Sequence, residues 1–175
     1  MASRVSIKIA LIIPILALLG VAVSCSSSSP SQAPDFTLPT LTGGNITLAE
    51  LKGTPVVLNF WSISCSYCRQ QLPYLENVAQ QAEGQVEVIA INMVDSAASV
   101  QNFFGDYEPT MTVALDENGE VFVNYCQNYD NSRGYIPFTL FIDGEGMVQY
   151  KRIGAFASEE ALWDTLHDVF GITIP

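Results

Sequence analysis

The pattern of hydrophobic and polar positions along this chain predicts strands that alternate with helices. The apolar run Val56–Trp61 (VVLNFW) is short and unbroken, which is typical of a strand buried on both faces of a sheet. After Cys65, apolar residues recur at positions 72, 75, 79 and 82, a helical spacing. Pro73 lies inside this predicted helix, so we expect a kink there. Residues 86–92 (VEVIAIN) predict a second buried strand, and a strand, a helix and a strand joined by short links form a βαβ unit with parallel strands.

The rest of the chain predicts a second helix, a hairpin and a terminal helix. These elements are a helix over 96–104, a short strand over 112–115 closed by a turn at 116–119, strands over 138–142 and 147–153, and a helix from 158 to 170. Ser158 suits the N-cap of the last helix and Gly171 suits its end. The expected fold class is therefore α/β, with a central mixed sheet and helices on both faces.

The N-terminus has the pattern of a targeting segment. Residues 7–23 are nearly all apolar, with Arg4 and Lys8 at their basic start, and this reads as a secretory signal peptide. Residues 22–25 (AVSC) resemble the lipobox of bacterial lipoproteins, in which the cysteine is lipidated. We expect a lipoprotein-type signal peptide over 1–24 and lipid attachment at Cys25. Plain secretion and an uncleaved anchor are the alternatives, and all three place the domain outside the cytoplasm.

A flexible tether and one globular domain are expected after this segment. Residues 26–34 (SSSSPSQAP) show no apolar periodicity, so we assign 25–34 as a Ser/Pro-rich tether. The globular domain is predicted over 35–175, about 140 residues. The whole chain is 49% hydrophobic and 14% charged, which excludes disorder for its bulk.

Charge limits the partners of the mature protein. Removal of residues 1–24 leaves five Lys and Arg against eighteen Asp and Glu, a net charge near −13. Such a surface repels nucleic acid and anionic lipid headgroups. Any membrane attachment must therefore come from the N-terminus.

The candidate chemistry lies in Cys65 and Cys68, two cysteines separated by two residues at the start of the first predicted helix. Free N–H groups and the helix dipole stabilise a thiolate there, so Cys65 is the candidate nucleophile and Cys68 the resolving thiol. Half of a zinc site is one alternative, but only Cys126 and His167 remain as further Cys or His ligands in the mature domain. A purely structural disulfide is the other, although so short a loop gains little stability from a bridge.

The segment around this pair resembles a known family. Residues 60–74 (FWSISCSYCRQQLPY) look like the active-site segment of the TlpA/ResA-type proteins, which are membrane-anchored, extracytoplasmic members of the thioredoxin superfamily. Residues 33–38 (APDFTL) and 136–143 (IPFTLFID) match the family's opening and its cis-proline segment, in the right order and spacing. The resemblance implies a thioredoxin-like fold.

The implied activity is that of an extracytoplasmic thiol–disulfide oxidoreductase, with a disulfide reductase favoured over an oxidase. Its partners would be disulfide-containing extracytoplasmic proteins and a membrane thiol–disulfide electron donor, with cytochrome c maturation as one pathway. No cofactor and no metal are implied, because the cysteine pair itself carries two electrons.

The resemblance also implies which residues surround the pair. Trp61, Ser66 and Tyr67 are its neighbours in sequence, and Ile136 and Pro137 are brought beside it, with Pro137 in cis. An ordinary trans proline at a strand entry is the alternative.

Two amides occupy positions where related proteins carry acids. Asn59 stands where thioredoxins have a buried aspartate that assists proton transfer, and Gln71 stands where some relatives have a glutamate. No acidic proton acceptor is therefore evident from the sequence.

Two further activities compete with this hypothesis. A peroxiredoxin-type peroxidase would need threonine and proline where this chain has Ser62 and Leu58. A non-enzymatic binding module would use the cysteine pair only as a structural disulfide. Cys126 is either a packed thiol or a third redox cysteine near the pair, and it precedes an unusually long run before Pro137.

Overall fold

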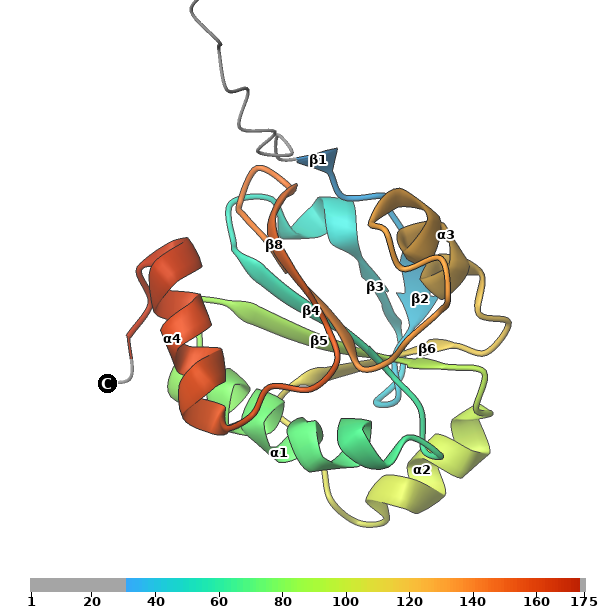
Figure 1. The fold of residues 1–175 in the computed structure, drawn as a ribbon. Helices are drawn as coiled ribbons and strands as arrows, with labels where there is room; N and C mark the ends of the chain where they lie inside the picture. The colour runs from blue at the N-terminus through green and yellow to red at the C-terminus, as the bar shows by residue number, and fades with distance from the viewer. Residues whose placement is uncertain (1–30, 174–175) are drawn as a thin grey trace, which may run out of the picture.

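The computed structural model describes residues 31–173, which build a six-stranded sheet with helices on both faces (Figure 1). Within this sheet the strand order is β1-β8-β7-β4-β5-β6. The strands are β1 (Ser31–Gln32), β4 (Val56–Trp61), β5 (Glu87–Met93), β6 (Thr112–Asp116), β7 (Phe138–Ile142) and β8 (Met147–Ile153). A second sheet pairs β2 (Thr37–Pro39) with β3 (Asn45–Thr47), and a short 3-10 helix follows over Leu48–Leu51. The helices are α1 (Ser66–Gln81), α2 (Ala97–Phe104), α3 (Glu120–Asn128) and α4 (Glu159–Phe170).

The predicted βαβ unit forms the centre of this fold. β4 pairs with β5 in parallel, and α1 connects the two strands. β4 also pairs with β7 in the antiparallel direction, and all six of its residues are buried. β7 and β8 form the predicted hairpin, with a register shift between Phe141 and Ile142. The expectation of a thioredoxin-like mixed sheet is therefore confirmed.

Each face of the sheet packs its own hydrophobic core. One core joins the sheet to α1, α2 and α4, and it includes Leu75, Val100 and Leu162. The other core lies against α3 and the small β2–β3 sheet, and it includes Leu38 and Tyr125. Figure 1 shows α1 and α4 on one side of the sheet and α3 on the other.

Helix α3 was not predicted from the sequence. The turn expected at 116–119 is present, since Gly119 N donates to the Asp116 carbonyl at 2.9 Å, and it leads directly into this helix, with Gly119 (φ 71°) as the N-cap. The buried carboxylate of Asp116 accepts hydrogen bonds from the N–H groups of Val121 (3.3 Å) and Phe122 (2.8 Å). These contacts satisfy N–H groups that a helix start leaves without partners.

Residues before the predicted domain boundary at residue 35 also take part in the described fold. Ser31 and Gln32 pair with Val148 and Met147 of β8, and Ala33 is buried. The last residues assigned to the tether are thus part of the fold. The predicted signal peptide over 1–24, Cys25 and the rest of the tether lie outside the described residues. Among the helices of residues 31–173, none is long and apolar enough to cross a membrane.

A buried carboxylate joins α1 to the loop before β6. Glu76 accepts hydrogen bonds from Tyr107 Oη (2.9 Å), Thr110 N (2.8 Å) and Met111 N (3.1 Å). Burial alone would raise the pKa of Glu76, but these donors and the Gln80 amide together lower it. The ionised carboxylate therefore stabilises the packing of this loop against α1. The kink expected at Pro73 stays a prediction, and α1 continues through that residue.

Candidate active site

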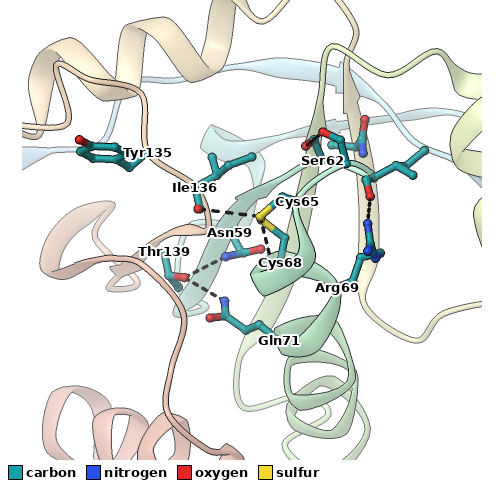
Figure 2. The surroundings of a disulfide bond; sticks show 12 residues. Asn59, Ser62, Cys65, Cys68, Arg69, Gln71, Tyr135, Ile136 and Thr139 are labelled. Carbon is teal, nitrogen blue, oxygen red and sulfur yellow. Dashed lines mark hydrogen bonds between the residues drawn. A yellow bond between two sulfur atoms is a disulfide. The ribbon is translucent and has the colours of Figure 1, made fainter.

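The Cys65–Cys68 disulfide lies where the central strand β4 passes into helix α1. Cys65 is the N-cap of α1, and its Sγ accepts a hydrogen bond from Cys68 N at 3.1 Å. The two cysteines are joined in a disulfide, with their Cα atoms 5.2 Å apart (Figure 2). The first sulfur therefore meets the free N–H groups of a helix start, as the sequence predicts.

The two sulfur-bearing residues differ in accessibility. Cys68 is 1% exposed and packs in the core beneath α1, whereas Cys65 is partly exposed. The intervening residues are open to solvent, with Ser66 exposed and Tyr67 65% exposed. A large partner can therefore approach the pair only through Cys65.

The loop before β7 brings Ile136 and Pro137 to the disulfide. The Ile136–Pro137 peptide bond is cis, so this implication of the resemblance is confirmed. The Ile136 carbonyl oxygen lies 3.8 Å from Cys65 Sγ (Figure 2). In the disulfide that sulfur carries no hydrogen, so the contact becomes a hydrogen bond only when Cys65 is a thiol.

Neutral side chains form a hydrogen-bonded network behind the pair. Asn59 Nδ2 and Gln71 Nε2 both donate to Thr139 Oγ1, at 2.9 and 3.3 Å. Gln71 Oε1 in turn accepts from Phe156 N at 2.9 Å. All three side chains are buried, and Figure 2 shows them on the Cys68 side of the disulfide. The hydrogen bonds among these described groups are made by amides, a hydroxyl and a backbone N–H.

Trp61 supports the pair from within the core. Its ring is fully buried and packs against Phe103 and Phe104, with ring centroids 5.4 and 5.9 Å away. Its Nε1 finds no hydrogen-bond partner among the residues that the structure describes. Trp61 is therefore a packing neighbour of the site and is not open to a substrate.

The long run before Pro137 is ordered by one buried amide. Asn131 Nδ2 donates to the Tyr135 carbonyl (2.8 Å), and Asn131 Oδ1 accepts from Tyr135 N (3.0 Å). This arrangement presents the Tyr135 ring to solvent, 53% exposed, next to Ile136 (Figure 2). Sequence reasoning missed both residues, although the unusual length of the run was visible.

Cys126 lies away from the Cys65–Cys68 pair. It is a free, buried thiol on α3 and belongs to the core on the opposite face of the sheet from Cys68. Burial raises the pKa of this thiol, although a hydrogen bond with Asn131 opposes the effect. The structure therefore agrees with the packed-thiol reading of Cys126.

Two charged residues near the pair were also missed. Asp95 Oδ2 accepts from Ile63 N at 2.8 Å, and Arg69 Nη1 donates to the Ile63 carbonyl oxygen. Asp95 lies 32 positions from Ile63 in the chain, so no local pattern signals the contact. Cys25, the candidate lipid site, lies outside the described residues.

Comparison with known proteins adds a family context to this geometry. A family model described as the AhpC/TSA family matches residues 30–151. The chain is 32% identical over 132 residues to the thioredoxin-like protein YneN of Bacillus subtilis, covering 74% of each chain. It is 33% identical over 130 residues to the thiol–disulfide oxidoreductase ResA of Bacillus cereus, covering 74% of this chain and 72% of ResA. The solved structure of the exposed lipoprotein thioredoxin Etrx1 of Streptococcus pneumoniae matches with a TM-score of 0.65 and 26% identity, over 77% of this chain and 99% of that one.

Proposed function

This chain belongs to the ResA-type thiol–disulfide oxidoreductases within the AhpC/TSA family, and from that membership we propose that its Cys65–Cys68 pair reduces disulfides in proteins outside the cytoplasm. Enzymatic thiol–disulfide exchange follows from the family. The direction of the reaction, the location and the roles of single residues are our proposal. The observation that carries it is the asymmetry of the pair, because Cys65 is partly exposed at a helix start and Cys68 is 1% exposed.

The chemistry needs two successive exchanges. The Cys65 thiolate attacks one sulfur of a partner disulfide, so that a Cys65–partner bond forms and the partner's S–S bond breaks, releasing one partner thiolate. The Cys68 thiolate then attacks Cys65 Sγ, forms the Cys65–Cys68 disulfide and releases the second partner thiolate. Two electrons pass to the partner, and a membrane thiol–disulfide carrier would restore the dithiol. No cofactor is needed for this cycle.

The geometry suits these roles. The N–H of Cys68 points at Cys65 Sγ, and such a donor favours the thiolate over the thiol. We therefore expect Cys65 to be the more acidic thiol and the attacking one. Cys68 is buried within reach of Cys65, so it can resolve a mixed disulfide but cannot meet a protein substrate first.

A peroxidase is not the function we favour for this site. Position 62, which would carry threonine in a peroxiredoxin-type site, holds Ser62, whose Oγ lies 3.1 Å from Ser64 Oγ. Position 58, which would carry proline, holds Leu58 in the middle of β4, paired with Ile89 on one side and Leu140 on the other.

We place the domain outside the cytoplasm on a lipid anchor at Cys25. The lipobox-like residues 22–25 and the preceding apolar segment support this location. The name of the pneumococcal relative, an exposed lipoprotein thioredoxin, supports the same arrangement. Mass spectrometry of the mature N-terminus tests it, and an unmodified Cys25 or an intact residue 1 would refute it. Cytochrome c maturation is one pathway in which such a reductase would act.

The reduction potential of the Cys65–Cys68 pair tests the direction of the reaction. Reducing members of the superfamily such as thioredoxin have potentials of about −270 mV, whereas the oxidant DsbA lies at about −120 mV. Equilibration with thiol–disulfide buffers, followed by alkylation and mass spectrometry, measures the value. We expect a result closer to the reducing limit, and a value close to the oxidising limit would make the protein an oxidase.

A further inference from the structure

In the loop that carries Cys65, charged side chains bind both backbone polar groups of Ile63. Its N–H donates to Asp95 Oδ2 at 2.8 Å, and its carbonyl oxygen accepts from Arg69 Nη1. Figure 2 shows the Arg69 side chain reaching this loop on the side of the pair away from Thr139. A carboxylate and a guanidinium thus hold both polar ends of one residue, two positions before Cys65.

Asp95 is fixed in turn by the neighbouring strand. Asn92 is fully buried at the end of β5, opposite Trp61 of β4, and its Nδ2 donates to Asp95 Oδ2 at 3.0 Å. Between Asn92 and Asp95 lies Val94, with a φ of 64° that a β-branched residue rarely adopts. Val94 is 59% exposed, so core packing does not require this conformation. The turn at Val94 is consistent with a chain path that brings Asp95 back to the loop before α1.

We propose that Asp95, with Arg69 as its counterpart, is a positioning residue that keeps the Cys65 sulfur at the N-terminus of α1. This inference rests on the proposed role of Cys65 as nucleophile. In the oxidised protein the disulfide itself ties Cys65 to α1. In the reduced protein that bond is absent, and Cys65 Sγ stays near the N–H of Cys68 through the backbone alone, by the bond from Arg69 N to the Cys65 carbonyl (3.1 Å) and by the position of the loop before Cys65. The contacts of Asp95 and Arg69 with Ile63, which we call the clamp, therefore matter in the state that attacks a substrate.

The geometry allows the charge of Asp95 to be separated from its position. The hydrogen bonds from Ile63 and Asn92 both end on the same oxygen, Oδ2. Asparagine with its carbonyl oxygen in that place keeps both bonds and removes only the negative charge. Alanine removes the charge and both bonds. A difference between the Asp95→Asn and Asp95→Ala variants thus reports position alone.

The test is the pH dependence of alkylation of Cys65 in the reduced full-length protein, resolved by peptide mass spectrometry. Loss of the neighbouring negative charge should lower the pKa of Cys65 slightly or leave it unchanged in Asp95→Asn. In Asp95→Ala we expect the pKa of Cys65 to lie above its value in Asp95→Asn. At pH values below that pKa, the fraction of Cys65 present as thiolate should be about threefold smaller in Asp95→Ala. The initial rate of exchange with a model disulfide should fall by a similar factor. Identical profiles for the two variants would overturn the proposal.

The other half of the clamp gives a second test if Asp95→Ala does not fold. Arg69 is exposed, and Arg69→Lys keeps the positive charge but has a shorter reach to the Ile63 carbonyl. We expect slower alkylation of Cys65 in this variant, and an unchanged profile would again overturn the clamp. Wild-type protein in a protein-disulfide reduction assay is the control for the function itself. A wild-type protein without activity in that assay would refute the proposed reductase, whereas the alkylation profiles of Cys65 would still decide the role of Asp95.

Discussion

Replacing Asn59 by aspartate places an ionisable group in the neutral network behind Cys68. Asn59 is 1% exposed, and the described hydrogen bonds join its side chain only to Thr139, at 2.9 Å. Fully buried carboxyl groups have pKa values raised by about 3 or more, which corresponds to about 4 kcal/mol for the charged form. A hydrogen bond from the Thr139 hydroxyl would recover about 1 to 2 kcal/mol. We therefore expect Asn59→Asp to lose about 2 to 3 kcal/mol of unfolding free energy at pH 7.

The sign of the pH dependence follows from the direction of the pKa shift. The carboxyl group that Asn59→Asp introduces has a higher pKa in the folded state than in the unfolded state. Stability should then be nearly normal below about pH 4, the unfolded pKa, and fall as pH rises through the folded pKa. The assay is urea unfolding of the oxidised protein between pH 3 and pH 8. Cys65 and Cys68 do not titrate in that state, and burial raises the pKa of Cys126 above its ordinary value.

A matched variant separates the charge from the lost amide. Asn59→Leu removes the same hydrogen bond without adding a titratable group, so its loss of stability should be independent of pH. If Asn59→Asp showed the same flat profile, the idea that burial at this site penalises a charge would be refuted. In the reduced enzyme, Asn59→Asp should also change the pH profile of disulfide reduction, because it supplies a proton acceptor on the Cys68 side of the pair.

Two further predictions concern the pair and the anchor of α1. In the reduced protein, iodoacetamide at mildly acidic pH should modify Cys65 before Cys68, because only Cys65 is partly exposed and meets the helix N-terminus. Preferential labelling of Cys68 would reverse the assigned roles. Glu76→Gln should lower the unfolding free energy by about 2 kcal/mol at pH 7, because a neutral amide oxygen accepts weaker hydrogen bonds than the carboxylate does. The folded-state pKa of Glu76 is lowered, so this loss should shrink as pH falls below about 4, and a loss that stays constant in urea unfolding down to pH 3 would contradict the assigned ionisation.

Local pattern was enough to predict the framework that positions the pair. The run Val56–Trp61 and the helical spacing after Cys65 identified β4 and α1 because burial on two faces, or on one helix face, leaves a direct mark in the sequence. Helix α3 was missed because Gly119 both closes the predicted turn and serves as the N-cap of the helix, and because the bonds from its first N–H groups to the Asp116 carboxylate leave no mark in the sequence.

The surroundings of the pair depend on contacts between distant segments. Asn59 and Thr139 are 80 positions apart, and Ile63 and Asp95 are 32 apart. No local spacing links such residues, since the sheet order alone brings β7 beside β4 and β5 on its other side. The resemblance could place Pro137 near Cys65, but it carried no information about Asp95 or Asn131.

The proposed reduction cycle requires that Cys65 attack a partner disulfide and that Cys68 release the product. The most direct measurement is trapping of partners by a Cys68→Ser variant in the native compartment, with Cys126 also replaced by serine to remove the third thiol. This variant keeps the nucleophile and lacks the resolving thiol, so it should accumulate thiol-sensitive, high-mass mixed disulfides on non-reducing gels, and a variant that also lacks Cys65 should show none. If Cys68→Ser traps no partner while the wild-type disulfide also resists reduction, the pair does not exchange disulfides and the proposed function is wrong.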